Sequence, residues 1–245
     1  MSHTPTPSPD ARFAATRWSI VLTAGDWRAG TAARRAMGEL ARQYWFPLYA
    51  FLRRQGHTPP AAEDLVQGFF TRLLEKDALG AVDRTKGKFR SFLLASLKNF
   101  LANEWHKQHA AKRGAGTILS LDALDAEARY AAEPIDQLTP DRVFERRWAL
   151  AVLDHVLARL RQEYESRGQA GVFVALEHVL VGGEKAHHAQ AAERLAITEG
   201  AAKVAAHRLR KRYRELLRDE IRQTVADDAL VDEEIRHLLD SLQAS

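Results

Sequence analysis

The sequence predicts an all-α protein, and three observations lead to that prediction. Apolar residues recur at steps of three and four, the period of an amphipathic helix, through most of the 245 residues. No segment alternates apolar and polar residues in the way of a half-buried strand. Glycine and proline number only 14 and 8, so few turns interrupt the helices. We therefore expect helices arranged in two domains, the second containing a helix-turn-helix.

Composition divides the chain into five segments. Residues 1–15 are rich in Ser, Thr and Pro at their start and lack an apolar period, which predicts a disordered tail. A first helical domain is expected over 16–113. Residues 114–138 hold scattered glycine, proline and acids, which indicates a linker with a short helical piece. A second helical domain is expected over 139–222, followed by an acidic helical extension at 223–245.

The first domain contains three long helices by its periodicity. The spacing predicts helices over 31–54, 59–75 and about 88–110, and Pro47 should bend or split the first of them. Thr58 and Pro59 suit the cap and first position of the second helix. Its apolar stripe consists of Ala62, Leu65, Val66, Phe69, Phe70, Leu73 and Leu74. Phe89 and Phe92 in the third helix have core spacing, with base stacking as the alternative role.

The second domain begins with another capping signal. Thr139 and Pro140 suit the cap and first position of a helix that runs to about Tyr164. Further helices are predicted over 169–181, 185–196, 199–220 and 228–242.

Charge is sorted along the chain. In 84–113, eight Lys and Arg residues accompany a single Glu, and 199–222 holds eight basic residues and four acids. The linker and the segment 227–240 are acidic, with one Arg each. Two basic blocks separated by an acidic linker indicate two contacts with one polyanion. Two solvated helix faces are the alternative interpretation.

The segment 188–213 is typical of a helix-turn-helix. It reads HAQAAERLAITEGAAKVAAHRLRKRY, with Thr198 placed to cap the second helix and Glu199 in its first turn. The inward face of this helix is predicted to be Ala202, Ala206, Leu209, Tyr213 and Leu216.

The outward face of the same helix carries the candidate DNA contacts. Lys203 and His207 lie one turn apart and would reach neighbouring bases, and Val204 would touch a thymine methyl group. Arg208, Lys211 and Arg212 would contact phosphates and position the helix. Two amphipathic helices with a basic face also occur in domains that bind no DNA, so this stretch alone leaves the choice open.

Three blocks of sequence together resemble the extracytoplasmic-function sigma factors of the sigma-70 family. The segment 190–212 is similar to their promoter-binding helix-turn-helix. The first domain contains AEDLVQGFFTRLLE at 62–75, which resembles the helix that holds the polymerase clamp. It also contains GKFRSFLLASLKNFLANEWHKQ at 87–108, which resembles the helix that melts and reads the minus-ten element. Gly68, Ala196, Ala201, Ala202 and Ala206 depart from the residues usual in the family.

The resemblance implies a role for each block. Asp64 and Gln67, with Glu63 and Thr71, would dock on the clamp coiled coil of core RNA polymerase. The separated non-template strand would be contacted by Lys86, Lys88, Arg90, Lys98, Asn99 and Asn103. Upstream phosphates would be held by Lys107, Lys112 and Arg113. The resemblance therefore implies that the chain is a promoter-specificity factor whose partners are core RNA polymerase and promoter DNA. An anti-sigma factor is left open as a third partner.

Several other classes of function find no support in the sequence. The chain has no cysteine, which excludes disulfides and cysteine catalysis, and its histidines lack the spacing of a zinc site. Phosphate-binding loops and serine-nucleophile motifs are absent. We expect no enzyme activity, no cofactor and no metal. Without a long apolar run or a leader pattern, a cytoplasmic location without membrane contact is expected.

Two competing functions remain open from the sequence. A stand-alone helix-turn-helix regulator would explain 188–213 but leaves 62–108 without a role, and a helical interaction scaffold would show no salt-dependent DNA binding. The acidic helix at 228–242 has two equal interpretations. It covers the basic recognition helix until polymerase binds, or it caps the second domain.

Overall fold

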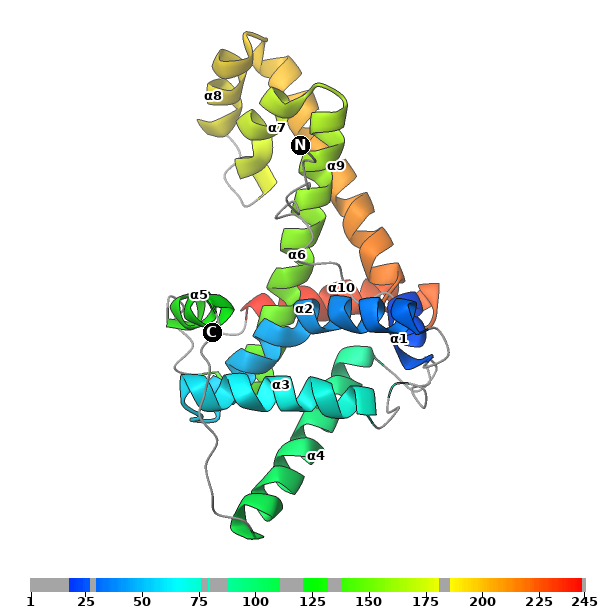
Figure 1. Ribbon diagram of the computed structural model, residues 1–245. Coiled ribbons are helices and arrows are strands. Elements are labelled where there is room, and N and C mark those ends of the chain that lie inside the picture. Colours follow the sequence, from blue (N-terminus) through cyan, green and yellow to red (C-terminus); the bar gives the residue numbers. More distant parts are fainter. Residues whose placement is uncertain are drawn as a thin grey trace, which may run out of the picture. The chain divides into compact units, whose positions relative to one another are not determined.

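A computed structural model of the chain describes residues 18–26, 30–75, 79, 88–110, 121–131, 138–180 and 186–243 (Figure 1). Every regular element in these ranges is helical, which confirms the all-α prediction. The helices group into two compact units. The small unit is Val152–Glu220, and the large unit joins the helices before Val152 to the residues from Ile221 onward. Each unit is described below by itself.

The two units do not have the bounds of the predicted domains. The large unit contains the beginning of the helix that opens the predicted second domain, and it also contains the acidic extension. Contacts between distant segments produce this grouping, whereas the predicted bounds came from composition along the chain. The predicted tail at 1–15 and the first part of the predicted linker, 114–120, lie outside the described residues, and the domain layout stays a prediction.

Four helices form the body of the large unit. They are α1 (Trp18–Gly25), α2 (Thr31–Arg54), α3 (Pro59–Glu75) and α4 (Phe89–Ala110). α1 packs on α2, α2 on α3, and α3 on α4. α2 continues through Pro47, which is buried, so of the two expected effects, a bend or a split, the split does not occur. Its C-terminal half supplies much of the core, including Tyr44, Leu48 and Phe51.

The linker contains a helix that docks on the large unit. α5 (Leu121–Ala131) contacts α2 and α3, which confirms the predicted helical piece. The Glu127 carboxylate accepts two hydrogen bonds of 2.8 Å from the Arg53 guanidinium and one of 2.7 Å from the Tyr49 hydroxyl. These charge-assisted bonds fix α5 to the C-terminal part of α2. The Arg129 guanidinium adds a contact 4.1 Å from the centre of the Phe46 ring.

The small unit is built on a long helix shared with the large unit. α6 (Pro140–Ser166) begins in the large unit, where Thr139 Oγ1 accepts a hydrogen bond from the Arg142 amide at 3.4 Å, and continues into the small one. Beyond it lie α7 (Ala170–Leu176), the 3₁₀ helix η4 (Glu177–Leu180), α8 (Ala186–Leu195) and α9 (Glu199–Arg222). Phe173, Ala206, Leu209 and Leu216 are fully buried in its core.

The acidic extension folds as part of the large unit. It comprises η5 (Asp228–Leu230) and α10 (Val231–Gln243), where Val231, Glu234 and Leu238 are buried. The prediction of a helix in this segment is confirmed. In the described part of the chain, every helix lacks the combination of length and apolar character that crossing a membrane requires.

Candidate nucleic-acid interface

Three of the four residues predicted to bind polymerase share an exposed face of α3. Asp64, Gln67 and Thr71 are exposed, and their spacing of three and four places them in one row along the helix. The Thr71 hydroxyl donates a 3.0 Å hydrogen bond to the Gln67 carbonyl oxygen. This row therefore presents a carboxylate, an amide and a hydroxyl to solvent from a rigid element.

Glu63 does not belong to this face. Its side chain is 1% exposed, and neither carboxylate oxygen has a hydrogen-bond partner among the described residues. One residue corresponds to a rotation of about 100° around a helix, which takes Glu63 from the row of Asp64 into the interior. The expectation of an exposed Glu63 is therefore corrected, and a docked partner would not reach its carboxylate in this structure.

Arg90 is also buried rather than available to DNA. Its side chain is 4% exposed, its Nε donates a 2.8 Å hydrogen bond to Glu145 of α6, and its Nη1 bonds Glu234 of α10. The guanidinium lies 4.0 Å from the centre of the Trp148 ring. Burial lowers the pKa of Arg90, but the carboxylates of Glu145 and Glu234 raise it by more. The net pKa therefore lies above its ordinary value, and the side chain stays charged. The expectation that Arg90 is open to contact the non-template strand is therefore corrected.

Two lysines of the predicted minus-ten surface are also paired with acids. Lys88 Nζ lies 2.5 Å from the Glu234 carboxylate, and Lys98 Nζ lies 2.5 Å from that of Asp141. Lys98 and Asp141 are both about half exposed, so water screens this pair and competes with it. Lys98 is accordingly open to exchange of its partner, whereas Lys88 contacts a carboxylate that is 1% exposed.

Asn99 and Asn103 lie beside a cavity between α3 and α4. Both are exposed, and the side-chain amide of Asn103 donates a 2.7 Å hydrogen bond from Nδ2 to the backbone carbonyl oxygen of Asn99. The cavity measures about 210 Å³, and Phe69, Arg72, Leu73, Ser96 and Phe100 complete its lining. Aromatic walls with amide, hydroxyl and guanidinium groups are chemically suited to a nucleobase.

Arg72 and Ser96 were missed by the sequence analysis. Arg72 lies on α3, which was examined for polymerase contacts, and Ser96 falls between apolar residues of α4. The i, i+4 spacing of Asn99 and Asn103 was the available signal for this face of α4. Which residues of α3 oppose that face depends on how the two helices pack, and no local pattern encodes it.

Four predicted contacts near this surface cannot be placed by their side chains. Lys86, Lys112 and Arg113 lie outside the described residues, and Lys107 belongs to α4 without a described side chain. Phe89, by contrast, is 3% exposed and packs edge-to-face on Tyr44 with ring centres 5.6 Å apart. The core interpretation of Phe89 is confirmed over the stacking alternative.

In the small unit, α8 and α9 are joined by a tight turn at residues 196–198. The Ile197 amide donates to the Ala192 carbonyl at 3.0 Å and the Ala196 amide to Glu193 at 3.2 Å, the pattern of a Schellman motif. Ala196 has φ = 52°, a left-handed conformation that favours glycine. Thr198 Oγ1 then accepts a 3.2 Å hydrogen bond from the Ala201 amide and caps α9, as predicted.

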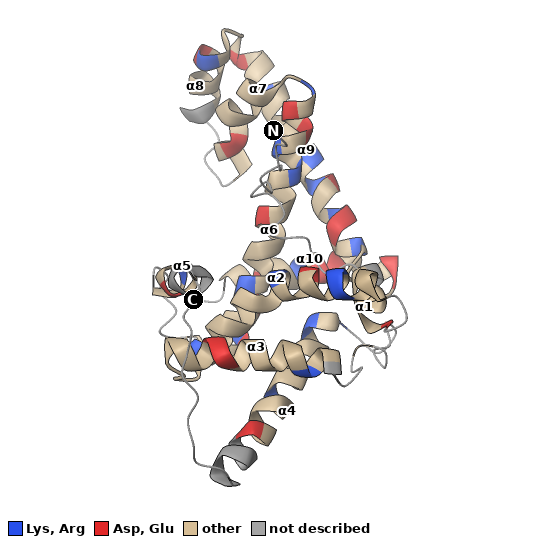
Figure 2. Ribbon diagram, viewed as in Figure 1, with Lys and Arg blue, Asp and Glu red and all other residues tan. Residues whose placement is uncertain are grey.

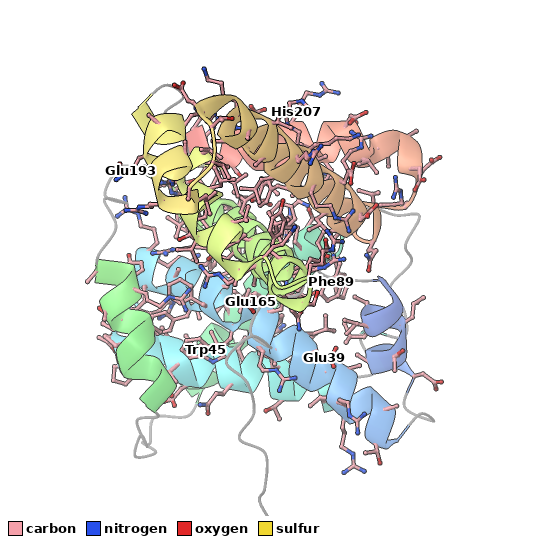
Figure 3. All side chains as sticks on the ribbon, turned by 90° about the horizontal axis from the view of Figure 1, so that it is seen from above. Glu39, Trp45, Phe89, Glu165, Glu193 and His207 are labelled. Carbon is pink, nitrogen blue, oxygen red and sulfur yellow. The ribbon has the colours of Figure 1, made fainter. Side chains whose placement is uncertain are left out.

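α9 has the two faces that the sequence predicts. Ala202, Ala206, Leu209 and Leu216 are fully buried, and Tyr213 is partly buried with its hydroxyl 3.4 Å from the Leu153 carbonyl oxygen. Among the predicted DNA contacts on this helix, the exposed side chains are Glu199, Lys203, Val204, His207, Arg208 and Lys211. In the ribbon of Figure 2, Lys and Arg positions are spread along α9 with acidic positions between them, and Figure 3 labels His207 on the same helix.

Two of the predicted contacts on α9 have acidic partners. Lys203 Nζ lies 2.9 Å from Glu199 one turn earlier, a pair that is more than half exposed and easily exchanged. Arg212 instead donates two hydrogen bonds, of 2.7 and 2.8 Å, to the Glu163 carboxylate on α6. Arg212 therefore fixes α9 to α6, and its expected role as a free phosphate contact is corrected.

Neither a related protein nor, in the described part of the chain, a group of metal-binding side chains was found. Comparison with protein-family models, curated proteins and solved structures found nothing similar to this chain. Among the described residues, no group of three or more His, Asp or Glu side chains is arranged to hold a metal ion.

Proposed function

We propose that this chain is a promoter-specificity factor of the sigma-70 type. In this proposal it binds core RNA polymerase, recognises minus-thirty-five and minus-ten promoter elements and promotes melting of the DNA. The chain is not an enzyme in this proposal and acts through three binding surfaces, one for polymerase and one for each promoter element. The order of the blocks at 62–75, 87–108 and 190–212 is the basis of the resemblance.

The observation that carries the proposal is the capped, exposed face of α9. A helix that follows a short turn and presents Lys203, Val204, His207, Arg208 and Lys211 to solvent has the chemistry for major-groove binding. The exposed row of Asp64, Gln67 and Thr71 adds a surface of the right character for the predicted polymerase contact. Neither surface requires residues that the structure buries.

A second candidate, a helix-turn-helix regulator that acts without polymerase, is favoured by a different observation. The α9 face is available as it stands, whereas Lys88 and Arg90 of the predicted minus-ten surface are bound to carboxylates. A regulator would need only the first surface. Most such regulators bind paired half-sites as dimers, so the oligomeric state separates the two candidates.

The deciding experiment measures binding to bacterial core RNA polymerase. The full chain is compared with the variant Asp64→Ala/Gln67→Ala and with the control Gln162→Ala/Glu165→Ala. The control removes the same two kinds of side chain, also three residues apart, from an exposed face of α6 (Glu165 is labelled in Figure 3). We expect a monomer that binds polymerase, at least tenfold weaker binding by the α3 variant, and unchanged binding by the control.

Two results would contradict this proposal. A folded dimer that binds DNA and not polymerase would establish the regulator instead. Equal weakening by both double variants would remove the assignment of the polymerase contact to α3.

A further inference from the structure

Glu234 of α10 holds two cations that the sequence assigns to nucleic acid. Its carboxylate bonds the Arg90 guanidinium and lies 2.5 Å from Lys88 Nζ, while its own side chain is 1% exposed. Arg90 precedes Glu234 by 144 residues. The most acidic segment of the chain thus supplies an anion to its most basic segment.

A carboxylate and a phosphate compete for the same donors. Both accept hydrogen bonds from guanidinium and ammonium groups in similar geometry, so Lys88 and Arg90 serve one or the other. Glu145 remains on Arg90 if Glu234 leaves, and the Trp148 ring supports the guanidinium from one side. Lys88, which is 34% exposed, has Glu234 as its acidic partner and would be released entirely.

The apolar packing of α10 against the large unit is incomplete. Val231 and Leu238 of α10 are apolar and fully buried. Leu239 is 44% exposed, and Leu230, just before the helix, is 42% exposed. A cavity of about 150 Å³ lies beside Lys88, between the residues 224–226 and the first turn of α10. At the other end, Arg146 donates a 2.6 Å hydrogen bond to the Leu242 carbonyl oxygen. Polar contacts therefore provide much of the attachment of α10 to the rest of the large unit.

We propose that α10 is an intramolecular latch on the minus-ten surface. Glu234 occupies Lys88 and Arg90 in the resting protein, and single-stranded DNA displaces α10 by supplying phosphates to the same two cations. This regulation rests on the proposed function, since it concerns the same nucleic-acid surface. It differs from a cover over the recognition helix, because the ion pairs of α10 with Lys88 and Arg90 and the 3.2 Å contact of His237 with Glu145 lie in the large unit.

The test compares Glu234→Gln with Glu233→Gln in the full chain. Both variants lose one negative charge from the same turn of α10, but Glu233 is exposed, whereas the ion pairs of α10 with Lys88 and Arg90 are made by Glu234. The probe is a fluorescein-labelled, mixed-sequence single-stranded DNA, titrated at several salt concentrations. The bound wild-type protein and Glu234→Gln make the same phosphate contacts, so their slopes of log K against log salt should be alike. Glu234→Gln no longer has to displace a carboxylate and should bind about tenfold more tightly at each salt concentration. Glu233→Gln changes only the overall attraction and should bind less than about threefold more tightly.

A second variant covers the case in which Glu234→Gln fails to fold. Arg146→Gln removes the contact to the end of α10 and leaves the ion cluster intact. It should also raise the affinity for the single-stranded DNA, and hydrogen exchange of the amides at 231–243 should become faster. In the wild-type protein, added single-stranded DNA should have the same effect on these amides.

The outcomes separate the latch from the proposed function. Equal affinities of Glu234→Gln, Glu233→Gln and wild type for the single-stranded DNA, in protein that binds polymerase, overturn the latch and leave the function standing. Protein that binds neither polymerase nor DNA in any variant overturns both. Unchanged exchange of α10 on addition of DNA also overturns the latch.

Discussion

Two arginines of α9, four residues apart, illustrate how different the roles of neighbouring cations are. Arg212 forms a bidentate pair with Glu163, whereas Arg208 is exposed and makes no ion pair within the described residues. We expect Arg212→Ala to lower the free energy of unfolding by about 1 kcal/mol, a value limited by partial exposure of the pair. Arg208→Ala should leave stability unchanged.

DNA binding should show the opposite pattern for these two residues. Arg208→Ala should reduce the salt slope of binding to duplex DNA by about 1, and Arg212→Ala should leave it unchanged. Urea unfolding and fluorescence anisotropy measure the two quantities. If Arg212→Ala alone reduces the salt slope, the pair with Glu163 opens on binding and the assignment of Arg212 to structure is wrong.

Glu63 places a polar carboxylate in the apolar interior of the large unit. A buried carboxylate without a hydrogen-bond partner costs stability, and an apolar side chain of similar size removes that cost. We expect Glu63→Met to raise the free energy of unfolding by about 1–3 kcal/mol. The control is Glu39→Met on the exposed surface of α2 (labelled in Figure 3), which should change it by less than about 0.5 kcal/mol. A loss of stability in Glu63→Met would show that the carboxylate has a stabilising partner.

At the scale of the element, the turn between α8 and α9 carries backbone strain. Ala196 adopts φ = 52°, where a Cβ atom is unfavourable. Ala196→Gly should therefore raise the free energy of unfolding by roughly 1 kcal/mol, measured by thermal and urea unfolding. Ala201→Gly, in the first turn of α9, should lower it by a similar amount because glycine is a poor helix former. A destabilised Ala196→Gly would mean that the entropy of glycine outweighs the relief of strain.

Local patterns predicted the helices well because a stripe of apolar residues fixes which face is buried. In α3, Ala62, Val66, Phe69 and Leu73 are buried as the stripe requires, while Leu74 at its margin is half exposed. The capping role of Thr198 and the inward face of α9 were predicted for the same reason. Each depends on residues within one or two turns.

The partners of the charged residues were much less predictable. Arg90 appears in the sequence as one cation in a basic block, and nothing near it specifies Trp148 or Glu234. Arg212 likewise meets Glu163, 49 residues earlier, only because α6 and α9 pack together. Exposed side chains such as Lys203 and His207 were assigned to the correct face because a helix alone decides their direction. Buried ion pairs depend on tertiary contacts that periodicity does not contain.

At the scale of the whole molecule, the same ion pairs make stability depend on acid. Hydrogen bonds from Arg53 and Arg212 hold the pKa values of Glu127 and Glu163 below their ordinary value of 4.5. Burial raises the pKa of Glu234, but Arg90 and Lys88 lower it by more. In all three cases the folded protein gives up the proton more readily than the unfolded chain. Their stabilisation is therefore complete above pH 4.5 and is lost as pH falls through the lowered values.

We accordingly expect both units to lose stability below pH 4.5, since each contains at least one of these carboxylates. His57 adds to this from pH 6.5 downward, because burial lowers its pKa and the unfolded chain takes up its proton first. Urea unfolding between pH 7 and pH 3 measures the effect. Glu163→Gln should unfold with a shallower dependence on pH, and an identical dependence would contradict the assigned pair.

The distance along the chain between Arg90 and Glu234 has a consequence for biosynthesis. A ribosome that adds 5 to 20 residues per second needs roughly 7 to 30 seconds to pass from Arg90 to Glu234, which are 144 positions apart. During that interval α5 and α6 are made while Lys88 and Arg90 still lack the carboxylate of Glu234. In the proposed latch, the nascent chain therefore carries these two cations open to ribosomal RNA until α10 has been made.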